Sequence, residues 1–244
     1  LKDYKYTMGV STLDCTSCGS CVSSCPKSGK ALKMVPAHEV HQVPAQWTYL
    51  TRLPEKAESG DKFPLKGSQF RQPLLEFSGA CAGCGETPYA KLLTQLFGDK
   101  MYLANATGCT QAWGAAMPCV PYCKNAQGKG VAWSNSLFEN NAEFSYGMCL
   151  AVRQLRDAAT NYVRELDALT KDETVKAAIA GYFAVYDDLD ASTPATEKLV
   201  AALESAKLTA EEQTIAQEIL KRKKDLAKKT MWMYGGDGWA YDIG

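Results

Sequence analysis

The sequence predicts an α/β domain that contains a helical insertion and is preceded by a short cysteine-rich segment. Closely spaced cysteines lie within residues 1–35, and a helical pattern, an apolar segment and a glycine loop follow in order after residue 87. Residues from about 150 to 229 keep a helical apolar spacing. Alternation of helix, strand and glycine loop is typical of α/β domains. We expect an extended connector at 36–76 and the α/β domain at 77–244, with the helical insertion at about 150–229.

Composition indicates a globular protein of one or two domains. The 244 residues are 46% hydrophobic, with 27 basic and 27 acidic side chains. Balanced charge gives no reason to expect nucleic acid as a partner, and no apolar run is long enough for a membrane span. Most of the ten cysteines lie in metal-type spacings, which favours a reducing compartment over a disulfide scaffold. Because the first residue is Leu1 and not Met, we expect the N-terminus to be a cut end of a longer polypeptide.

The first cysteine cluster has the spacing of bacterial ferredoxins. It reads Cys15-x-x-Cys18-x-x-Cys21-x-x-x-Cys25-Pro26. In that arrangement three thiolates bind one [4Fe–4S] cluster and the fourth binds the other cluster of a two-cluster, ferredoxin-like α+β domain. The spacing disfavours zinc or disulfides. We expect short strands at 6–11 and 31–35, and a partner motif that precedes residue 1.

The connector carries regularly spaced prolines. They recur about every ten residues, which favours an extended path over long helices: Pro36, Pro44, Pro54, Pro64 and Pro73. Trp47, Tyr49 and Leu50 are too apolar for a free linker, so we expect the connector to lie across a neighbouring domain.

A second cysteine pair opens the α/β domain. One turn can direct the sulfurs of Cys81 and Cys84 to a single point, and on this pair alone zinc and iron–sulfur are equally compatible. A helix is expected at Thr87–Phe97, then a strand at 101–104 that leads to Cys109, a candidate third ligand. The spacing leaves several candidates for a fourth ligand: Cys119, Cys123 and, more weakly, Cys149.

The stretch 128–144 mixes polar and aromatic residues, which is compatible with a binding cleft or with a capped helix entrance. Three or four helices are expected over 148–229, without catalytic residues. Their start signals are capping boxes at Thr170/Glu173 and Thr209/Glu212 and the pair Thr193-Pro194. The basic run that starts at Lys221 is expected to be a solvated helix end.

A glycine loop follows the last apolar segment. A buried strand is predicted at 231–234, and Gly235-Gly236-Asp237-Gly238 comes directly after it. Glycines let backbone amides reach a diphosphate, and an aspartate among them can hold its Mg²⁺. Turns also use such sequences, so the strand before the loop is what favours a binding role.

Together these motifs resemble the pyruvate:ferredoxin (flavodoxin) oxidoreductase family over essentially the whole chain. The motifs that carry the resemblance are Cys81-Ala-Gly-Cys84-Gly-Glu86-Thr-Pro-Tyr, Asn105-Ala-Thr-Gly-Cys109, Trp133-Ser-Asn-Ser-Leu-Phe-Glu139-Asn-Asn-Ala-Glu-Phe and Gly235-Gly-Asp237-Gly-Trp-Ala-Tyr-Asp-Ile-Gly. The resemblance implies a thiamine-diphosphate-binding α/β domain with Mg²⁺ and three [4Fe–4S] clusters in the complete polypeptide. It also implies oxidative decarboxylation of pyruvate with coenzyme A to acetyl-CoA and CO₂, with electrons passed to ferredoxin or flavodoxin. A homodimer in the cytoplasm or an anaerobic organelle would fit the family.

The resemblance also implies roles for individual residues. Cys81, Cys84 and Cys109 match three ligands of the cluster nearest the thiamine. The fourth ligand of this cluster in the family lies beyond Gly244, so the resemblance disfavours Cys119 and Cys123 as the fourth ligand. Cys15, Cys18 and Cys21 match ligands of one ferredoxin-type cluster, and Cys25 matches a ligand of the other. Asp237 matches the Mg²⁺ ligand, and Gly236 and Gly238 flank it in the cofactor-binding loop. Glu86 and Cys109 match residues at the thiamine site. No catalytic residue is identified.

Two short segments depart from the family pattern. Thr110-Gln111-Ala112 stands where the family often has Ser-Ser-Ile, and the loop from Cys119 to Cys123 replaces a Ser/Thr-Pro-rich loop. The second departure leaves an additional thiol role open.

Three alternatives remain from the sequence. One is a related oxidoreductase for another 2-oxoacid, and another is an iron–sulfur electron-transfer module without thiamine. The third is a zinc-stabilised interaction protein. Because the ligand sets are incomplete within residues 1–244, we expect this chain alone to be inactive.

Overall fold

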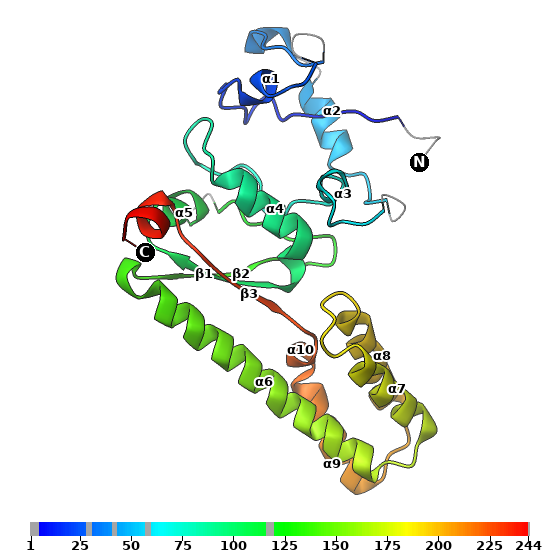
Figure 1. Cartoon of the computed structure of the whole chain (residues 1–244). Helices are drawn as coiled ribbons and strands as arrows, with labels where there is room; N and C mark the ends of the chain where they lie inside the picture. The colour runs from blue at the N-terminus through cyan, green and yellow to red at the C-terminus, as the bar shows by residue number, and fades with distance from the viewer. Residues whose placement is uncertain (1–4, 28–30, 41–42, 57–59, 116–119, 244) are drawn as a thin grey trace. The chain divides into compact units, whose positions relative to one another are not determined.

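The structure is a computed structural model that describes residues 5–27, 31–40, 43–56, 60–115 and 120–243. The chain divides into two compact units, which we describe separately (Figure 1). The cysteine unit comprises residues 1–99 and 108–131, and the sheet unit comprises residues 100–107 and 132–244.

A parallel sheet forms the centre of the sheet unit. In the described part of the chain it has the strands β1 (Met101–Ala106), β2 (Ala132–Ser136) and β3 (Thr230–Tyr234), in the order β2-β1-β3. Asn105 of β1 pairs with Asn135 of β2 and with Tyr234 of β3, so all three strands end at the same edge. An α/β arrangement is thereby confirmed, as are the strands expected at 101–104 and 231–234.

The central position of β1 accounts for its burial. Its residues Leu103, Ala104 and Ala106 are fully buried, as expected for a parallel strand covered on both faces. β3 was expected to be buried but is only partly so, and Met233 is 45% exposed. The reason is that β3 pairs with β1 along one side, whereas β1 has a neighbour on each side.

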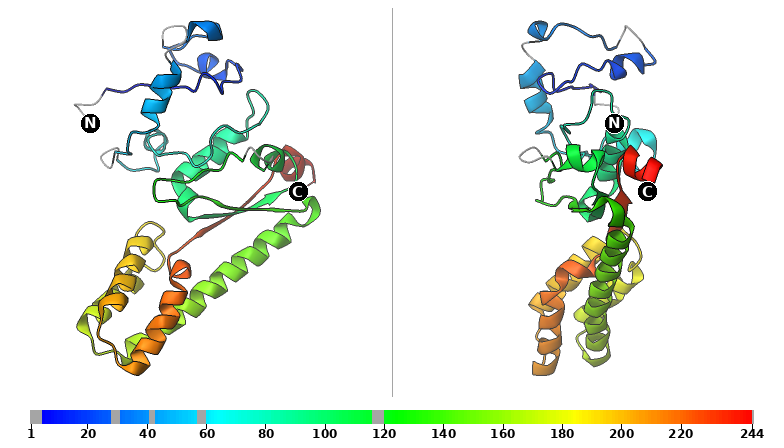
Figure 2. Two further views of the ribbon diagram at one scale, coloured as in Figure 1. Left: turned by 180° about the vertical axis from the view of Figure 1, so that it is seen from behind. Right: turned by 90° about the vertical axis from the view of Figure 1, so that its left-hand side faces the viewer.

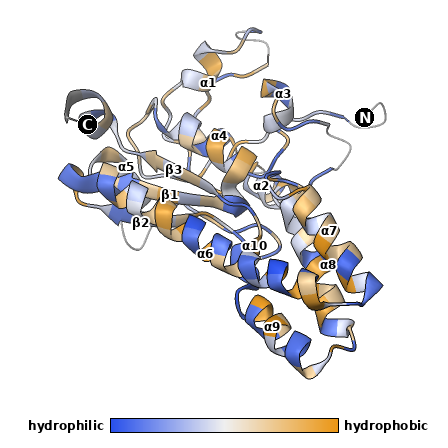
Figure 3. Cartoon of the chain, turned by 60° about the horizontal axis from the view of Figure 1, so that its bottom comes forward, coloured by the Kyte–Doolittle hydropathy of each residue, from blue (hydrophilic) through white to orange (hydrophobic). Residues whose placement is uncertain are grey.

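Helices make up most of the sheet unit. The long α6 (Asn141–Leu169) is followed by α7 (Glu173–Ala184), α8 (Ser192–Ser205), α9 (Ala210–Lys221) and the short α10 (Lys223–Leu226), which confirms the predicted helical region. Helix α9 packs along α6, and α7 packs against α8 (Figure 2). Hydrophobic and hydrophilic residues alternate along α6, as amphipathic packing requires (Figure 3). The buried core includes Val163, Leu166, Ile179, Leu199 and Ile219.

One of the predicted capping boxes is present. Thr209 caps α9, with its N–H 2.8 Å from Glu212 Oε2 and the Glu212 N–H 3.4 Å from Thr209 Oγ1. The box predicted at Thr170 is wrong, because the Thr170 N–H closes α6 on Leu166 and Asp172 caps α7 instead.

The start of α8 and the basic end of α9 lie close to where the sequence predicts them. Helix α8 begins at Ser192, one residue before the predicted start at Thr193. The basic run lies at the end of α9, and the Lys221 side chain is 66% exposed, as expected for a solvated helix end.

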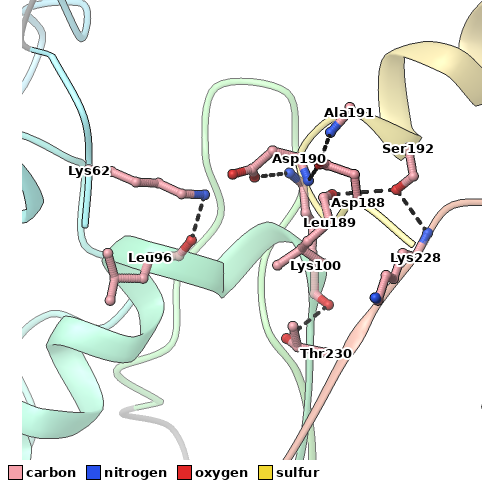
Figure 4. Close-up of polar contacts among 10 residues, drawn as sticks. All are labelled: Lys62, Leu96, Lys100, Asp188, Leu189, Asp190, Ala191, Ser192, Lys228 and Thr230. Atoms are coloured by element: carbon pink, nitrogen blue, oxygen red, sulfur yellow. Dashed lines mark hydrogen bonds and ion pairs between the residues drawn. The ribbon is translucent and has the colours of Figure 1, made fainter. Parts of the chain in front are cut away.

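Polar contacts connect the α7–α8 loop to the amino ends of β1 and β3 (Figure 4). Lys100 Nζ lies 2.6 Å from Asp190 Oδ1, and the Lys228 N–H donates to Ser192 Oγ at 3.1 Å. Thr230 Oγ1 donates to the Lys100 carbonyl at 3.4 Å. The Lys100 side chain is only 12% exposed, so its ion pair is better shielded from water than a surface pair.

The cysteine unit contains short helices and loops. They are α1 (Ser20–Ser23), η1 (Ala37–Glu39), α2 (Val43–Leu50), α3 (Leu65–Ser68), α4 (Thr87–Phe97) and α5 (Cys109–Gly114), and η3 (Gly98–Lys100) follows α4 in the chain. The helix predicted at Thr87–Phe97 is confirmed. Its inner side buries Ala90 and Thr94, and Thr94 Oγ1 accepts from the Leu74 N–H at 3.0 Å.

Two predictions for the cysteine unit need correction. The strands expected at 6–11 and 31–35 do not form, because neither segment has a partner strand among the described residues and an unpaired strand leaves its backbone groups unsatisfied. The connector predicted to be extended contains the two-turn helix α2, in which Pro44 occupies the first turn, where proline is tolerated. None of the helices in the described ranges has the length and apolar composition needed to cross a membrane.

Candidate functional site

A tight turn carries the first cysteine pair of the α/β region. The Cys84 N–H donates to the Cys81 carbonyl at 3.0 Å, and Gly83 between them has φ of 72°. That left-handed conformation favours glycine, which is how this sequence closes the turn. Cys81 is exposed and Cys84 is half-buried, and the described cysteines are all free thiols.

The ferredoxin-type motif forms a loop that leads into α1. Gly19 has φ of 74° and lies directly before α1, which contains Cys21. Cys15, Cys18 and Cys21 are exposed, whereas Cys25, which belongs to the other cluster in the ferredoxin arrangement, is half-buried.

Within the cysteine unit the two cysteine loops lie side by side. A Cβ placed on Gly83 would be 3.5 Å from Ser20 Oγ and 3.8 Å from Cys18 Cβ. The Cys18 sulfur lies 3.4 Å from Ser20 Oγ. Hydrogen bonds from the Ser20 side chain and backbone lower the pKa of the Cys18 thiol from its ordinary value, with a smaller contribution from the Gly83 backbone. These contacts favour the thiolate, which is the form that binds metal.

Cys109 begins α5 directly after the loop that leaves β1. Gly108 before it has φ of 150° and ψ of −148°, a backbone region that is essentially restricted to glycine. The Cys109 side chain is exposed, while its neighbour Thr110 is buried. Among the described residues, no three His, Cys, Asp or Glu side chains are grouped closely enough to hold a metal ion, so the ligand sets stay predictions.

Glu86 lies at the start of α4. Its Oε2 accepts from Trp113 Nε1 at 3.5 Å, and the Trp113 ring is buried. The glutamate is half-buried, so it lies between the interior of the cysteine unit and its surface.

In the sheet unit, polar residues gather where β1 and β2 end. Asn105 Nδ2 donates to Asn135 Oδ1 at 2.8 Å, and Asn135 Nδ2 donates to Thr107 Oγ1 at 2.8 Å. Ser136 Oγ lies 2.9 Å from Asn141 Oδ1, which connects the same edge to the start of α6. Asn105 is fully buried, and its Oδ1 has no hydrogen-bond partner in the part of the chain described here.

The glycine loop after β3 extends this edge. A Cβ on Gly235 would lie 2.9 Å from Ala106 Cβ and 2.8 Å from the Trp239 ring, so only glycine fits there. Asp237 is exposed within the loop, between the buried Gly236 and the π-helical turn η5 (Gly238–Ile243). The Gly236 carbonyl accepts from the Ala240 N–H at 2.9 Å, which fixes the loop on the turn that follows it.

These residues fit the groups that the sequence implies. An exposed carboxylate in a glycine loop suits Mg²⁺ and a diphosphate, because glycines have no side chains that would keep the backbone amides away from the ligand. An unpartnered buried amide oxygen at the same edge can accept from a bound group. Free, mostly exposed thiols suit iron–sulfur ligation.

Among the remaining cysteines, Cys123 is less suited to ligation. Burial raises the pKa of the Cys123 thiol, and the nearby Glu76 charge raises it further, which disfavours the thiolate that binds metal. Cys123 Sγ instead donates to the Pro73 carbonyl at 3.6 Å. Cys149 is half-buried on α6, and Cys119 lies outside the described residues.

Sequence reasoning missed β2 and with it the roles of Asn135 and Ser136. The sequence of 128–144 is compatible with a binding cleft or a capped helix entrance, and the structure places a strand and then the start of α6 there. β2 has no β-branched residue and its pattern of burial does not alternate, so the usual strand signature is weak. Gly130 before it, followed by Val131 and Trp133, was the available signal.

Comparison with known proteins gives consistent matches over the whole chain. It is 49% identical over 243 residues to the pyruvate:ferredoxin oxidoreductase of Moorella thermoacetica, which covers 98% of this chain and 21% of that protein. It is 44% identical over 245 residues to the pyruvate-flavodoxin oxidoreductase of Klebsiella pneumoniae, which covers 100% of this chain and 20% of that protein. It is 43% identical over 274 aligned positions to the pyruvate dehydrogenase (NADP(+)) of Cryptosporidium parvum, which covers 99% of this chain and 14% of that protein. No protein-family model matches the chain.

The matched proteins define an oxidoreductase class whose members are named for pyruvate. The chain spans about a fifth of the length of the first two relatives, 21% and 20%. Within that class the resemblance seen in the sequence is confirmed. Along essentially its whole length, the chain is homologous to one segment of the pyruvate:ferredoxin (flavodoxin) oxidoreductases.

Proposed function

We propose that this chain supplies the thiamine diphosphate loop and iron–sulfur ligands of an enzyme that oxidises pyruvate with coenzyme A to acetyl-CoA and CO₂. Electrons leave through [4Fe–4S] clusters to ferredoxin or flavodoxin. The observation that carries the proposal is similarity over the whole chain to relatives named for this chemistry, with intact loops at the carboxyl edge of the sheet. Open α/β sheets bind their ligands at that edge.

In this proposal Asp237 holds Mg²⁺, and the backbone of Gly236 and Gly238 faces the diphosphate of thiamine diphosphate. Thiamine diphosphate supplies the electron sink for decarboxylation when bound. Glu86 lines the thiamine pocket, where its contact with Trp113 fixes the orientation of the carboxylate.

The iron–sulfur part of the proposal assigns the cysteines by motif. Cys81, Cys84 and Cys109 ligate the cluster nearest the thiamine; Cys15, Cys18 and Cys21 ligate a second cluster, and Cys25 a third. The neighbouring positions of Cys18 and Gly83 support electron transfer between the first two clusters. In the same scheme residues 1–35 are the end of a ferredoxin-like domain, 36–76 a connector, and 77–244 part of the thiamine-diphosphate domain. A homodimer and a cytoplasmic or organellar location stay predictions from the resemblance.

The glycine-loop assignment is tested by Asp237→Ala in the complete polypeptide that contains this chain. Loss of a metal ligand should weaken Mg²⁺–thiamine diphosphate binding at least about tenfold, or about 1.4 kcal/mol, because Asp237 would no longer help to hold the cation that neutralises the diphosphate. Isothermal titration of the apoenzyme measures this affinity. Asp167→Ala, at an exposed position on α6, is the control and should leave it unchanged. Equal affinity in Asp237→Ala and the control would show that the loop is only a turn.

A further inference from the structure

A chain of hydrogen bonds fastens the loop that leaves β1 to the end of β2. Thr107 Oγ1 accepts from Asn135 Nδ2 at 2.8 Å and donates to the Ser136 carbonyl at 2.6 Å. Asn135 Nδ2 also donates to that carbonyl at 2.9 Å, and Asn135 Oδ1 accepts from Asn105 Nδ2 at 2.8 Å. We call Asn105, Thr107, Asn135 and Ser136 the loop clamp.

The loop clamp uses most of its polar atoms. Both polar atoms of the Asn135 amide and the single hydroxyl of Thr107 are engaged. In a partly buried site a lost partner leaves an unsatisfied group, which costs about 1–3 kcal/mol. Such an arrangement therefore holds the backbone at Thr107 in one place relative to β2.

Thr107 is two residues before Cys109. The residue between them, Gly108, has φ of 150° and ψ of −148°, an extended conformation that residues with a Cβ rarely adopt. On the other side of Cys109, Thr110 is buried and is the second residue of α5. Cys109 thus lies two residues after Thr107 and directly before the buried Thr110, and its own side chain is exposed.

We propose that Thr107 and Asn135 are positioning residues for Cys109, and that they set the properties of the iron–sulfur cluster that this cysteine ligates. The inference rests on the proposed function, because it assumes that Cys109 is a cluster ligand. Cluster potentials respond to the placement of the thiolate sulfurs and to hydrogen bonds near them. A clamp that fixes the backbone two residues away fixes the sulfur through the covalent chain.

The test compares two substitutions of one residue in the complete polypeptide, purified without oxygen. Thr107→Val removes the hydroxyl and keeps the side-chain shape, whereas Thr107→Ser keeps the hydroxyl and removes a methyl group. Thr107→Val should shift the midpoint potential of one cluster and change the g-values of its electron paramagnetic resonance signal. Thr107→Ser should leave both at the wild-type values.

A matched control separates positioning from general stability. Thr160 on α6 is fully buried, and its hydroxyl lies 3.1 Å from the Tyr182 hydroxyl. Thr160 is 19 residues beyond the start of α6 at Asn141, about 28 Å along the helix at 1.5 Å per residue. Thr160→Val should lower thermal stability without moving any cluster potential.

A second variant keeps the test decisive if Thr107→Val folds poorly. Asn135→Ala removes the donor to Thr107 and adds no charge, so it should shift the same potential in the same direction. In the double variant the two shifts should not add, because both act through one hydrogen bond.

Two results would overturn the inference while leaving the proposed function intact: wild-type potentials in Thr107→Val and Asn135→Ala, or equal shifts in Thr107→Ser and Thr107→Val. If the wild-type protein holds no iron, the proposed function itself fails, and the inference fails with it.

Discussion

Gly108 is the residue whose backbone decides where Cys109 lies. Its φ of 150° and ψ of −148° belong to a region that side chains with a Cβ rarely adopt. A Cβ at this position would meet no atom within 4 Å, so the demand for glycine is conformational and not steric. A substitution there tests backbone strain alone.

Gly108→Ala should destabilise the protein by about 1–3 kcal/mol, because the loop must keep a disfavoured conformation or change its path. We also expect a lower iron content, since a changed path moves Cys109. Thermal unfolding and iron analysis of the complete polypeptide measure both effects. Gly147 in α6 also has open space around its Cβ but lies in a regular helix. Gly147→Ala should stabilise by about 0.5–1 kcal/mol and keep the iron; the same response at both positions would contradict this account.

At the scale of the element, the start of α9 is held by a charged cap. The Glu212 carboxylate accepts from the N–H and the hydroxyl of Thr209, each at 2.8 Å. These hydrogen bonds lower the pKa of Glu212 from its ordinary value. The cap therefore contributes stability above the unfolded pKa, about 4.3, and the contribution is lost as the pH falls through the lower folded pKa.

Glu212→Gln should reduce the thermal stability of the helices at pH 6, where the wild-type carboxylate is charged. The difference between wild type and variant should shrink as the pH falls below about 4.3, because the wild-type carboxyl becomes neutral too. Circular dichroism of the helices over this pH range measures it. Glu211→Gln, one residue earlier and exposed, is the control and should show a much smaller change. A Glu212→Gln difference that is independent of pH would contradict the role of the carboxylate.

Elements with strong local signals were predictable from the sequence, and elements defined by their neighbours were not. Helix α4 and the cap at Thr209 follow from Pro88 and from a local side-chain pair. Strand β2 and helix α2 were missed, because pairing with β1 and local helix formation override weak or contrary patterns. Asp172 caps the start of α7 in place of Thr170, because Thr170 forms the end of α6.

The candidate site also has residues that were predictable from local motifs and residues that were not. Cys81, Cys84 and Asp237 were identified from short motifs, because their chemistry depends on local spacing. The loop clamp was not, since Asn135 meets Thr107 only through the register of two parallel strands. Long-range pairings of this kind carry no local sequence pattern.

At the scale of the whole molecule, the proposed function requires electrons to pass from the thiamine site to the outside through the cysteine motifs. Cys18 lies beside the Cys81–Cys84 turn, at the point where two of the proposed clusters would be neighbours. Removal of its thiolate should interrupt electron exit without affecting the thiamine loop, which belongs to another part of the chain.

Cys18→Ala in the complete polypeptide should still support a single turnover of pyruvate, measured as released CO₂. Multiple turnover with ferredoxin should fall by at least about tenfold, because one cluster loses a ligand. Cys149→Ala, at a half-buried cysteine on α6, is the control and should retain ferredoxin reduction. Unchanged ferredoxin reduction in a Cys18→Ala protein shown to lack the cluster would refute this route.

The most direct test of the central claim is the metal content of the complete polypeptide, purified and analysed without oxygen. Three four-iron clusters predict roughly twelve iron and twelve sulfide per chain, together with a brown colour from sulfur-to-iron charge transfer. Stoichiometric zinc in a colourless protein would contradict the account, because the cysteine motifs would then be structural zinc sites.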